Sequence, residues 1–566
     1  MVDGLGVSNW EALILREIAQ SPFCELALFV VNEERLSQRS RAHRLWSGRS
    51  HLAYRLYTRV DARIYGRPDD AFAHVALLPE FAGVERLHTM PLRPRPFEHR
   101  FDDDAIAAVR AADLDVILRF GFNIVRGEIL EAARHGVWSF HHGDNRHYRG
   151  TPAFFWEMYE RNPVSGTLLQ RLTDELDGGG VLYRSWSATH PVSLRRGRNG
   201  AFWKSAHFVM RRLRDVHERG WEYVERLPTY TEASACDRPL YRMPSNRQVV
   251  RLVMRILAGI AARRLRRLAV RDQWFIAYKQ RGQGPPLSPS FFDDLRIVQP
   301  PQDRYYADPF LLSEGDADYV LVEEFEYRRG KGVICSLDLR AGSPGSTRRL
   351  ALECEHHLSY PFTFELDGAT YMVPESSAAG TIELYRAERL PDRWVHERVL
   401  MSGVEAADTT IFEDAGLLWM FTSLAVAGAP STDELFLFWA TSLDGEWMPH
   451  PLNPVVSDVR RARPAGRVFG CEGDILRPAQ DCSLRYGGGI VICRVDVLST
   501  TDYRETEIGR LDGGWAPGVV ATHTYDVGPR YEVVDGMRAQ PRIPLPPGLR
   551  RYGRRPAQAR RARARS

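Results

Sequence analysis

Residues 305–312 have the sequence YYADPFLL and are followed by YVLVEEF at 319–325. Two apolar, aromatic-rich runs across a short turn are typical of paired antiparallel strands. Related pairs follow in SYPFTFELDGATYMVPES at 359–376, ADTTIFEDAGLLWMFTS at 407–423 and, in part, RPAQDCSLRYGGGIVICRV at 477–495. Each unit indicates an inner strand that enters with Asp or Pro, a tight turn, and a second strand.

The spacing of these units predicts a β-propeller. Positions 308, 360 and 408 are 52 and 48 residues apart, which suits blades of four strands. If one blade is assembled from both ends of the region, about five blades fit. We therefore expect an all-β, five-bladed propeller over residues 273–545.

The first part of the chain has a different pattern. The apolar runs CELALFVV, AHVALL, LDVILRFGF and GVWSF alternate with stretches typical of helices, such as DDAIAAVRAADL and RGEILEAARHG. Strands that alternate with helices indicate βαβ units. For residues 1–225 we expect an α/β domain with a Rossmann-type, mostly parallel sheet.

Residues 226–272 are expected to be a linker with a basic amphipathic helix. Its apolar positions fall near helical spacing with arginines between them. Such a helix could lie on an anionic membrane. We favour a helix that packs its apolar stripe on one or both domains. Residues 546–566 are expected to be a disordered, Arg-rich tail.

The composition is that of a soluble globular protein, with 44% hydrophobic and 26% charged residues. The formal net charge of +4 comes from the tail, because residues 549–566 hold eight arginines and no acid. Seven scattered cysteines do not indicate a disulfide framework. No signal peptide or membrane span is apparent. We expect a cytoplasmic protein.

The loop HHGDNRHYRG at 141–150 and the turn TDELDGGG at 173–180 are candidates for a catalytic site. A loop after the strand VWSF places His141 at the carboxyl edge of a parallel sheet, where α/β folds build their sites. A carboxylate such as Asp177 near an imidazole favours its charged form, as general acid/base chemistry requires. The alternative is a polar loop and a glycine-rich turn without catalytic function. The three histidines lack the spacing of a zinc site.

The segment from LDVILRFGF through WSFHHGDNRHYRG to TDELDGGGVL resembles the folate-dependent formyltransferase family. The resemblance covers roughly residues 24–215 and implies that His141 and Asp177 are catalytic. Ser139 falls where the family has an asparagine that donates to the formyl oxygen, and the loop also departs from the family sequence. The resemblance further assigns these residues: folate contacts, Phe120, Gly121, Phe122, Gly178 and Gly179; acceptor contacts, Asn145, His147, Tyr148, Arg149 and Gly150.

The β region resembles the propeller of plant glucosamine inositolphosphorylceramide transferases and the five-bladed folds of furanosidases and arabinanases. The matching segments are ADPF at 307–310, HLSYPF at 357–362, VPES at 373–376, ADTT at 407–410 and RPAQDCS at 477–483. In hydrolytic relatives, acidic residues of the inner strands converge on the central cavity. The residues expected to line the cavity are Asp308, His357, Tyr360, Glu375, Asp408, Arg477, Gln480 and Asp481.

Together the two resemblances imply N-formylation of an amine, on an amino sugar or glycoconjugate, with 10-formyltetrahydrofolate as co-substrate and no metal. One alternative is a glycoside hydrolase that acts through the propeller. Another is a non-catalytic glycan-binding protein with a degenerate front domain. A methionyl-tRNA role is not expected, because such enzymes follow RNA phosphates with a basic C-terminal domain, and we expect no nucleic-acid partner.

Overall fold

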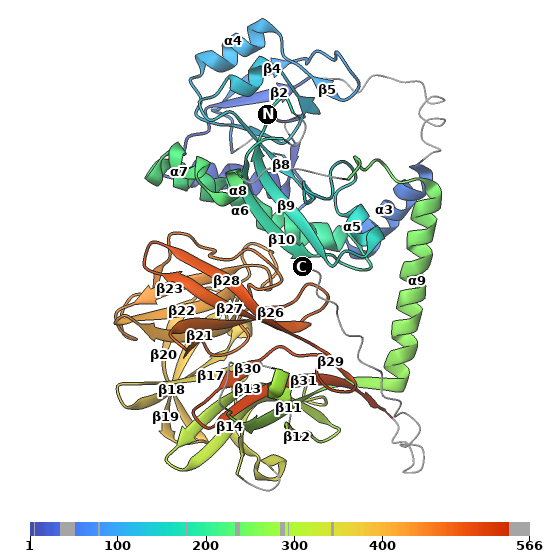
Figure 1. Ribbon diagram of the computed structural model, residues 1–566. Coiled ribbons are helices and arrows are strands. Elements are labelled where there is room, and N and C mark those ends of the chain that lie inside the picture. The colour runs from blue at the N-terminus through green and yellow to red at the C-terminus, as the bar shows by residue number, and fades with distance from the viewer. Residues whose placement is uncertain are drawn as a thin grey trace.

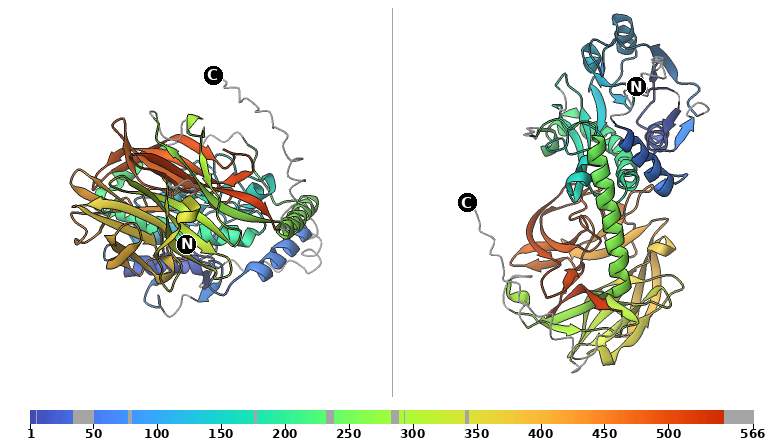
Figure 2. Two further views of the ribbon diagram at one scale, coloured as in Figure 1. Left: turned by 90° about the horizontal axis from the view of Figure 1, so that it is seen from below. Right: turned by 90° about the vertical axis from the view of Figure 1, so that its right-hand side faces the viewer.

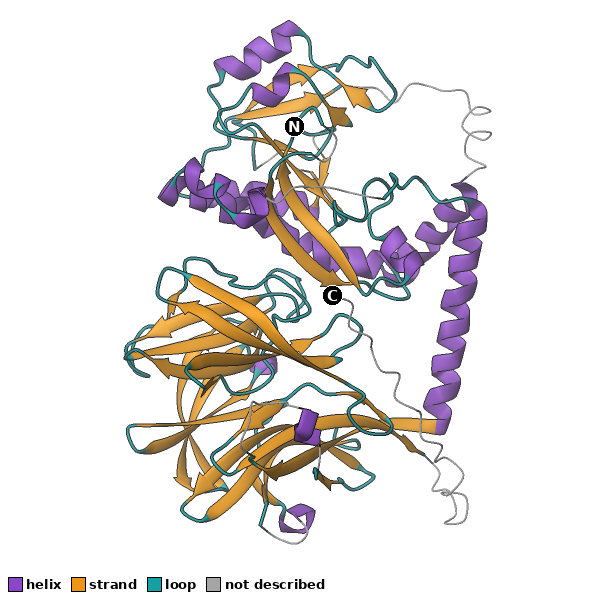
Figure 3. Ribbon diagram, in the orientation of Figure 1, coloured by secondary structure: helices purple, strands orange, loops and turns teal. Residues whose placement is uncertain are grey.

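Figure 1 shows the computed structural model. It describes residues 1–4, 6–33, 51–76, 80–175, 178–231, 238–282, 289–292, 294–340 and 344–542. The predicted tail, 546–566, lies outside these residues. Helices gather in the part up to residue 231, called here the N-terminal half, and strands make up the part from residue 270, the propeller (Figure 3).

The largest sheet of the N-terminal half has the strand order β10-β9-β8-β6. β6 (Ile117–Arg119) and β8 (Val137–His141) are parallel, whereas β9 (Val164–Arg171) and β10 (Val181–Ala188) are antiparallel to their neighbours. Separate two-stranded sheets pair β2 (Leu28–Asn32) with β4 (Glu85–Thr89), β1 (Gly6–Ser8) with β3 (His74–Ala76), and β5 (Glu98–His99) with β7 (Ile124–Val125).

The predicted Rossmann-type sheet is therefore wrong, because the described residues form no continuous parallel sheet. Two local features explain the error. RGEILEAARHG, expected to be a crossover helix, forms only the 3-10 turn Glu128–Glu131 between Gly127 and Gly136, both at positive φ. The TDELDGGG stretch joins β9 to β10 as an antiparallel pair, which requires no crossover.

Within the described residues, eight helices cover and connect these sheets. In the described residues they are α1 (Asn9–Gln20), α3 (Leu52–Tyr65), α4 (Asp103–Ala111), α5 (Phe155–Glu160), α6 (Leu194–Arg219), α7 (Trp221–Glu225), α8 (Pro228–Thr231) and α9 (Asn246–Ala269). α6 lies between the N-terminal sheet and the propeller, and α9 runs along one side of the molecule to the first propeller strand (Figures 1 and 2).

The propeller has five sheets, here called blades 1 to 5. From the inner to the outer strand, blade 1 is β13 (Arg304–Glu314), β14 (Ala317–Glu326), β15 (Lys331–Asp338) and β16 (Arg349–Leu352), and blade 2 is β17 (Ser359–Leu366), β18 (Ala369–Glu375), β19 (Thr381–Arg389) and β20 (Arg393–Ser402). Blade 3 is β21 (Ala406–Asp414), β22 (Leu417–Leu424), β23 (Leu435–Ala440) and β24 (Met448–Pro449), and blade 4 is β25 (Phe469–Cys471), β26 (Asp474–Asp481), β27 (Gly489–Leu498) and β28 (Tyr503–Asp512).

Blade 5 is built from both ends of the propeller. Its inner strands are β29 (Val519–Ala521), β30 (Tyr525–Val527) and β31 (Tyr531–Pro541), and its outer strands are β11 (Val270–Gln280) and β12 (Arg296–Val298). β11 and β31 pair without interruption from Val270↔Pro541 to Gln280↔Tyr531. This pairing closes the ring of blades.

The N-terminal half covers the end of the propeller at which the inner strands begin, called here the entrance end. The β22–β23 loop lies at this end because the strands of a blade are antiparallel. From this loop, Asp433 accepts a hydrogen bond of 2.8 Å from Lys204 Nζ, and both side chains are almost fully buried. Next to it, Glu434 receives two hydrogen bonds from Arg211, of 2.7 and 2.9 Å. The backbone of Trp186 on β10 also bonds to Ser457 and Val459.

We expect the substitution Lys204→Met to destabilise the protein by about 3–5 kcal/mol, because it leaves the Asp433 carboxylate buried without its cation. The control is Arg16→Met, which breaks the Arg16–Glu80 pair whose side chains are 39% and 45% exposed. That change should cost at most about 1 kcal/mol. Urea unfolding of both variants is the measurement, and equal losses would contradict a buried electrostatic contact between the halves.

Candidate functional site at the entrance end of the propeller

One residue from each blade occupies an equivalent position near the start of the inner strand. These residues are Asp308, Tyr360, Asp408, Arg463 and His523, all at most 7% exposed. The first three have φ of 49°, 44° and 54°, and each lies in a β-bulge between its inner and second strand. A non-glycine residue in the left-handed region inside a strand is strained and is typical of functional sites.

The sequence analysis placed the fourth unit at Arg477, and this is wrong. Arg463-Pro464-Ala465 and Arg477-Pro478-Ala479 share the sequence RPA, but the first enters blade 4 and the second lies on its second strand, β26. Arg477 turns away from the axis and makes bonds of 2.8 and 2.9 Å with Glu505. The repeat of the tripeptide could have revealed Arg463, because 463 restores the interval of about 50 residues between blades.

Asp408, Glu375 and Arg463 meet in one cluster. Arg463 donates to both carboxylate oxygens of Asp408, at 2.6 and 3.2 Å, and to Glu375 at 3.1 Å. Gln480 Nε2 donates to Asp408 at 2.7 Å. Burial and the nearby Glu375 raise the pKa of Asp408 to about 7, although Arg463 opposes the shift. The predicted residues Glu375, Asp408 and Gln480 are thus brought together, around an arginine that the prediction missed.

His523 forms the centre of a second cluster. Its Nδ1 pairs with Asp535, and its Nε2 lies 3.7 Å from Asp308 Oδ1. Trp274 stacks on the imidazole with ring centroids 4.1 Å apart. Burial alone would lower the pKa of His523, but Asp535 and Asp308 outweigh it and raise the pKa to about 9. His523 and Asp535 carried no signal in the motifs, because they come from the blade whose strands are contributed by both ends of the propeller.

Asp308, His523 and Asp535 are also the described residues grouped so that they could hold a metal ion, with ligand atoms within 4.8 Å of one another. A histidine side chain must be neutral to bind a metal ion. Because the two carboxylates favour protonated His523, the arrangement is that of an ion-paired cluster.

The other predicted cavity residues make separate contacts. The Tyr360 hydroxyl accepts from Gly466 N at 2.7 Å and holds the blade 4 inner segment against blade 2. His357 Nε2 lies 3.5 Å from the buried Glu323, another acid that the prediction missed. Asp481 lies outside the cluster and pairs with Arg510.

A pocket of about 330 Å³ lies between the two halves, next to the Arg463 cluster. We call it the inter-half pocket. His190, Arg196 and Gly200 line it from the N-terminal half, and Thr432 and Tyr486 line it from the propeller. Tyr486 is 47% exposed, yet its hydroxyl accepts from Arg463 at 3.3 Å and its ring meets His523 edge-on at 5.4 Å. Tyr486 therefore connects the pocket to both clusters.

Two of the predicted catalytic residues of the N-terminal half, Ser139 and His141, lie on β8. His141 Nε2 lies 3.3 Å from the Tyr148 carbonyl, and Ser139 Oγ accepts from Arg119 Nε at 3.0 Å. Ser139 is 1% exposed. Asp177, the proposed partner of His141, lies outside the described residues.

The predicted acceptor residues contact both their own loop and the elements around it. Buried Asn145 accepts from Arg184 at 3.3 Å, and His147 Nδ1 lies 2.8 Å from Asp144. The Tyr148 hydroxyl donates to Glu160 at 3.0 Å. Gly150 has φ of +105°, and a Cβ there would lie 2.0 Å from the Tyr241 carbonyl oxygen. Arg149 lines a small cavity beside this glycine, and its buried Nε has no hydrogen-bond partner among the described residues.

The predicted folate residues likewise have structural contacts. A Cβ at Gly121 would meet Asp3, one at Gly179 would overlap the Arg171 carbonyl, and one at Gly178 would meet Glu175. The amide of Phe122, at φ of 60°, donates to Asp3. These close approaches explain the glycines without a ligand.

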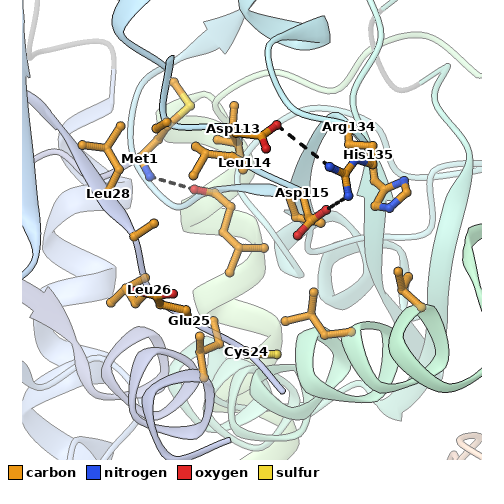
Figure 4. Close-up of a pocket in the computed structure, with 18 of the residues that line it drawn as sticks. Met1, Cys24, Glu25, Leu26, Leu28, Asp113, Leu114, Asp115, Arg134 and His135 are labelled. Carbon is orange, nitrogen blue, oxygen red and sulfur yellow. Dashed lines mark hydrogen bonds and ion pairs between the residues drawn. The ribbon is translucent and has the colours of Figure 1, made fainter. Parts of the chain in front are cut away.

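A cavity of about 740 Å³ in the N-terminal half lies elsewhere (Figure 4). Its walls are mainly apolar, and its polar side chains include Asp115, which pairs with Arg134 at 2.6 Å. Of the predicted folate residues, Phe120 alone lines it. The cavity and the loop at 141–150 are therefore different places.

Comparison with known proteins relates the propeller to one family. A family model described as the N-terminal region of glucosamine inositolphosphorylceramide transferase 1 matches residues 298–512. The protein of that name from Arabidopsis thaliana is 35% identical over 209 residues, which are 36% of this chain and 27% of that protein. The protein from Oryza sativa subsp. japonica is 32% identical over 36% of this chain and 28% of its own length. The similar segment thus spans little more than a quarter of these relatives.

Among solved structures, two glycoside hydrolases show a partial likeness to this chain. The catalytic domain of Coprinopsis cinerea GH62 α-L-arabinofuranosidase is 11% identical, covers 46% of this chain and 97% of its own, and has a TM-score of 0.32. A family 117 glycoside hydrolase from Zobellia galactanivorans is 11% identical, covers 48% and 91%, and has a TM-score of 0.30.

These findings confirm the resemblance of the β region to the plant transferases. They overturn the prediction of an N-formyltransferase, because the relatives carry the name of a different transferase and none of the proteins named here is a formyltransferase. The sequence analysis relied on the resemblance of the histidine loop and the glycine-rich turn to the formyltransferase family, whereas Ser139 bonds to Arg119 of the neighbouring strand β6. The folate co-substrate, the absence of a metal and the cytoplasmic location stay predictions.

The raised pKa of His523 predicts a pH dependence of stability. Because the folded-state pKa of about 9 exceeds the ordinary 6.5, the stabilisation is fully present below pH 6.5 and is lost as pH rises through 9. The difference corresponds to roughly 3 kcal/mol. Thermal unfolding should show the loss in the natural protein and a flatter profile in His523→Gln.

His450→Gln is the matched control, because burial lowers the pKa of this histidine, which is then neutral across the same range. It should leave the slope between pH 6.5 and 9 unchanged. A His523→Gln profile as steep as that of the natural protein would show that His523 is not the titrating group.

Proposed function

We propose that this chain recognises the sugar part of a glycoconjugate at the entrance end of the propeller. The observation that carries the proposal is the cluster in which Arg463 joins Asp408, Glu375 and Tyr486 beside the inter-half pocket. Carboxylates, guanidinium groups and tyrosine hydroxyls match the hydroxyl groups of a sugar as hydrogen-bond acceptors and donors.

The accessible members of the cluster define how a sugar would bind. Asp408 is 2% exposed and serves to hold Arg463, whereas the Glu375 side chain is 15% exposed and Tyr486 is 47% exposed. A sugar ring that lies on the Tyr486 ring gains apolar contact, and its hydroxyls reach Glu375. The buried ion pair keeps Arg463 and Tyr486 in position before the ligand arrives, which lowers the entropic cost of binding.

The relatives support a carbohydrate ligand. The name of these relatives refers to glucosamine and to inositolphosphorylceramide. The segment that matches their family runs from the end of β12 to the end of β28 and therefore contains blades 1 to 4. Of the five equivalent residues at the blade entrances, all except His523 lie in this segment. The sequence similarity to the relatives therefore includes the proposed site. The ligand class proposed is therefore a sugar of a glycolipid or related glycoconjugate.

We expect Tyr486→Ala and Glu375→Gln each to weaken sugar binding about tenfold or more, because each removes a contact at the pocket while the buried ion pair of Arg463 with Asp408 remains. The matched control is Tyr319→Ala on β14, at the opposite end of blade 1. A glycan array followed by calorimetry with the best ligand is the measurement. Unchanged binding in both variants, or equal loss in the control, would contradict this site.

Glycoside hydrolysis is a second candidate, favoured by one observation. Asp408, with its pKa raised to about 7, lies in one cluster with Glu375, and a carboxylic acid that is still protonated near neutral pH can protonate a leaving group. In this scheme Asp408 is the acid and Glu375 the base or nucleophile.

If this candidate is correct, Asp408→Asn should abolish the release of sugar from a glycan substrate. Asp481→Asn, which changes an acid outside the cluster, should leave release unchanged. Release would be measured by chromatography of the products. Binding without release by the natural protein would reject hydrolysis and leave recognition standing.

A further inference from the structure

The exposed face of α9 is apolar along its whole length. Val250, Met254, Leu257, Leu265 and Leu268 are between 55% and 76% exposed. At 100° per residue these positions fall on one side of the helix. In the described part of α9, only Val249 and Leu252 are fully buried. The sequence analysis favoured a stripe packed against a domain, and for these five positions that is wrong.

α3 presents a second stripe of the same kind. Leu52, Leu56, Val60 and Ile64 follow one another at intervals of four residues and are between 46% and 64% exposed. Exposed arginines at 55, 59 and 63 alternate with them. The helix has one acid, Asp61, which is 5% exposed and accepts from the Arg195 amide at 2.7 Å. The exposed face of α3 is thus apolar and cationic without an acid.

α9 carries the same charge. It contains seven arginines and no Asp or Glu, with Arg255 and Arg266 held by Tyr159 O and Asp272. An apolar stripe flanked by arginines is typical of helices that lie in the interface of an anionic membrane. Contiguous exposed apolar area of this kind is uncommon on a protein that has no partner for it.

The two helices belong to one surface. Asn246 Oδ1, in the first turn of α9, accepts from Ala53 N on α3 at 2.9 Å, and His51 Nδ1 lies 3.1 Å from the Pro244 carbonyl. α9 stands on the outer side of the molecule, with α3 beside its first turns (Figures 1 and 2). A flat partner could therefore contact both stripes at once.

We propose that this α3–α9 surface binds the headgroup region of an anionic lipid membrane. A second copy of the chain is a poorer partner, because self-association would place the arginines of one copy against those of the other. In the described residues no helix is long and apolar enough to cross a membrane. The contact is thus peripheral, with apolar side chains among the lipids and arginines at the phosphates. It goes beyond the proposed sugar recognition and does not depend on it.

The test is flotation of the full chain with vesicles of phosphatidylcholine, with and without phosphatidylserine. The natural protein should bind only the anionic vesicles. The triple variant Arg251→Gln, Arg263→Gln, Arg264→Gln should bind them on the order of 100-fold more weakly, at roughly fivefold for each arginine lost. The variant Met254→Gln, Leu257→Gln, Leu265→Gln should lose binding to a similar degree. The substituted side chains of both variants are exposed or charged and do not belong to the hydrophobic core. We therefore expect both variants to fold, and circular dichroism would check this.

Val399→Gln with Ile508→Gln is the matched control, because these side chains are 45% and 50% exposed on propeller strands. It should bind vesicles like the natural protein. Absence of binding to anionic vesicles, equal binding to neutral ones, or a dimer that the helix variants dissociate would each overturn the proposal. Because the vesicles contain no glycolipid, failure of sugar recognition would leave these results unaffected.

Discussion

The pairing of β11 with β31 is the constraint on which the rest of the structure depends. Eleven consecutive residues of each strand join the first part of the propeller to its last. This antiparallel ladder completes blade 5, and with it places His523 and Asp535 beside Asp308 of blade 1. The same strand β11 follows directly after α9, so the closure also determines where the helix leaves the propeller.

Buried charged side chains from several blades meet at the centre of the propeller. Asp308, Glu323, Asp408 and Asp535 are buried, and burial of an unpaired carboxylate is costly. Arg463 of blade 4 pairs with Asp408 of blade 3, and His523 of blade 5 lies 3.7 Å from Asp308 of blade 1 and pairs with Asp535 of its own blade. Because Asp408 and Asp308 receive their cations from neighbouring blades, the electrostatics favour the closed ring. The bulges at Asp308, Tyr360 and Asp408 turn these side chains toward one another, and the strain is offset by the hydrogen bonds they make.

The two halves of the chain meet at the entrance end of the propeller and contribute different features to the molecule. The N-terminal half covers the entrance end through buried pairs at Lys204 and Arg211, and so forms one wall of the inter-half pocket. Helix α9 spans the two halves along the side and carries the cationic apolar face. The proposed sugar pocket and the proposed lipid-binding face lie on one molecule, as the recognition of a glycolipid at a membrane surface would require.

The sequence by itself determined the strands and intervals of the first three blades. Apolar runs at a period of two, tight turns and a spacing near 50 residues are local properties, and they located Asp308, Tyr360 and Asp408 without reference to any contact. It also determined the arginine-rich, amphipathic character of α9. Only the tertiary structure decided that the fourth blade begins at Arg463 rather than at the identical tripeptide of 477, that His523 completes the ring, and that the N-terminal sheet is mixed. These outcomes depend on contacts between strand edges and charged groups that are hundreds of residues apart in the sequence. No local sequence pattern determines the energy of such contacts.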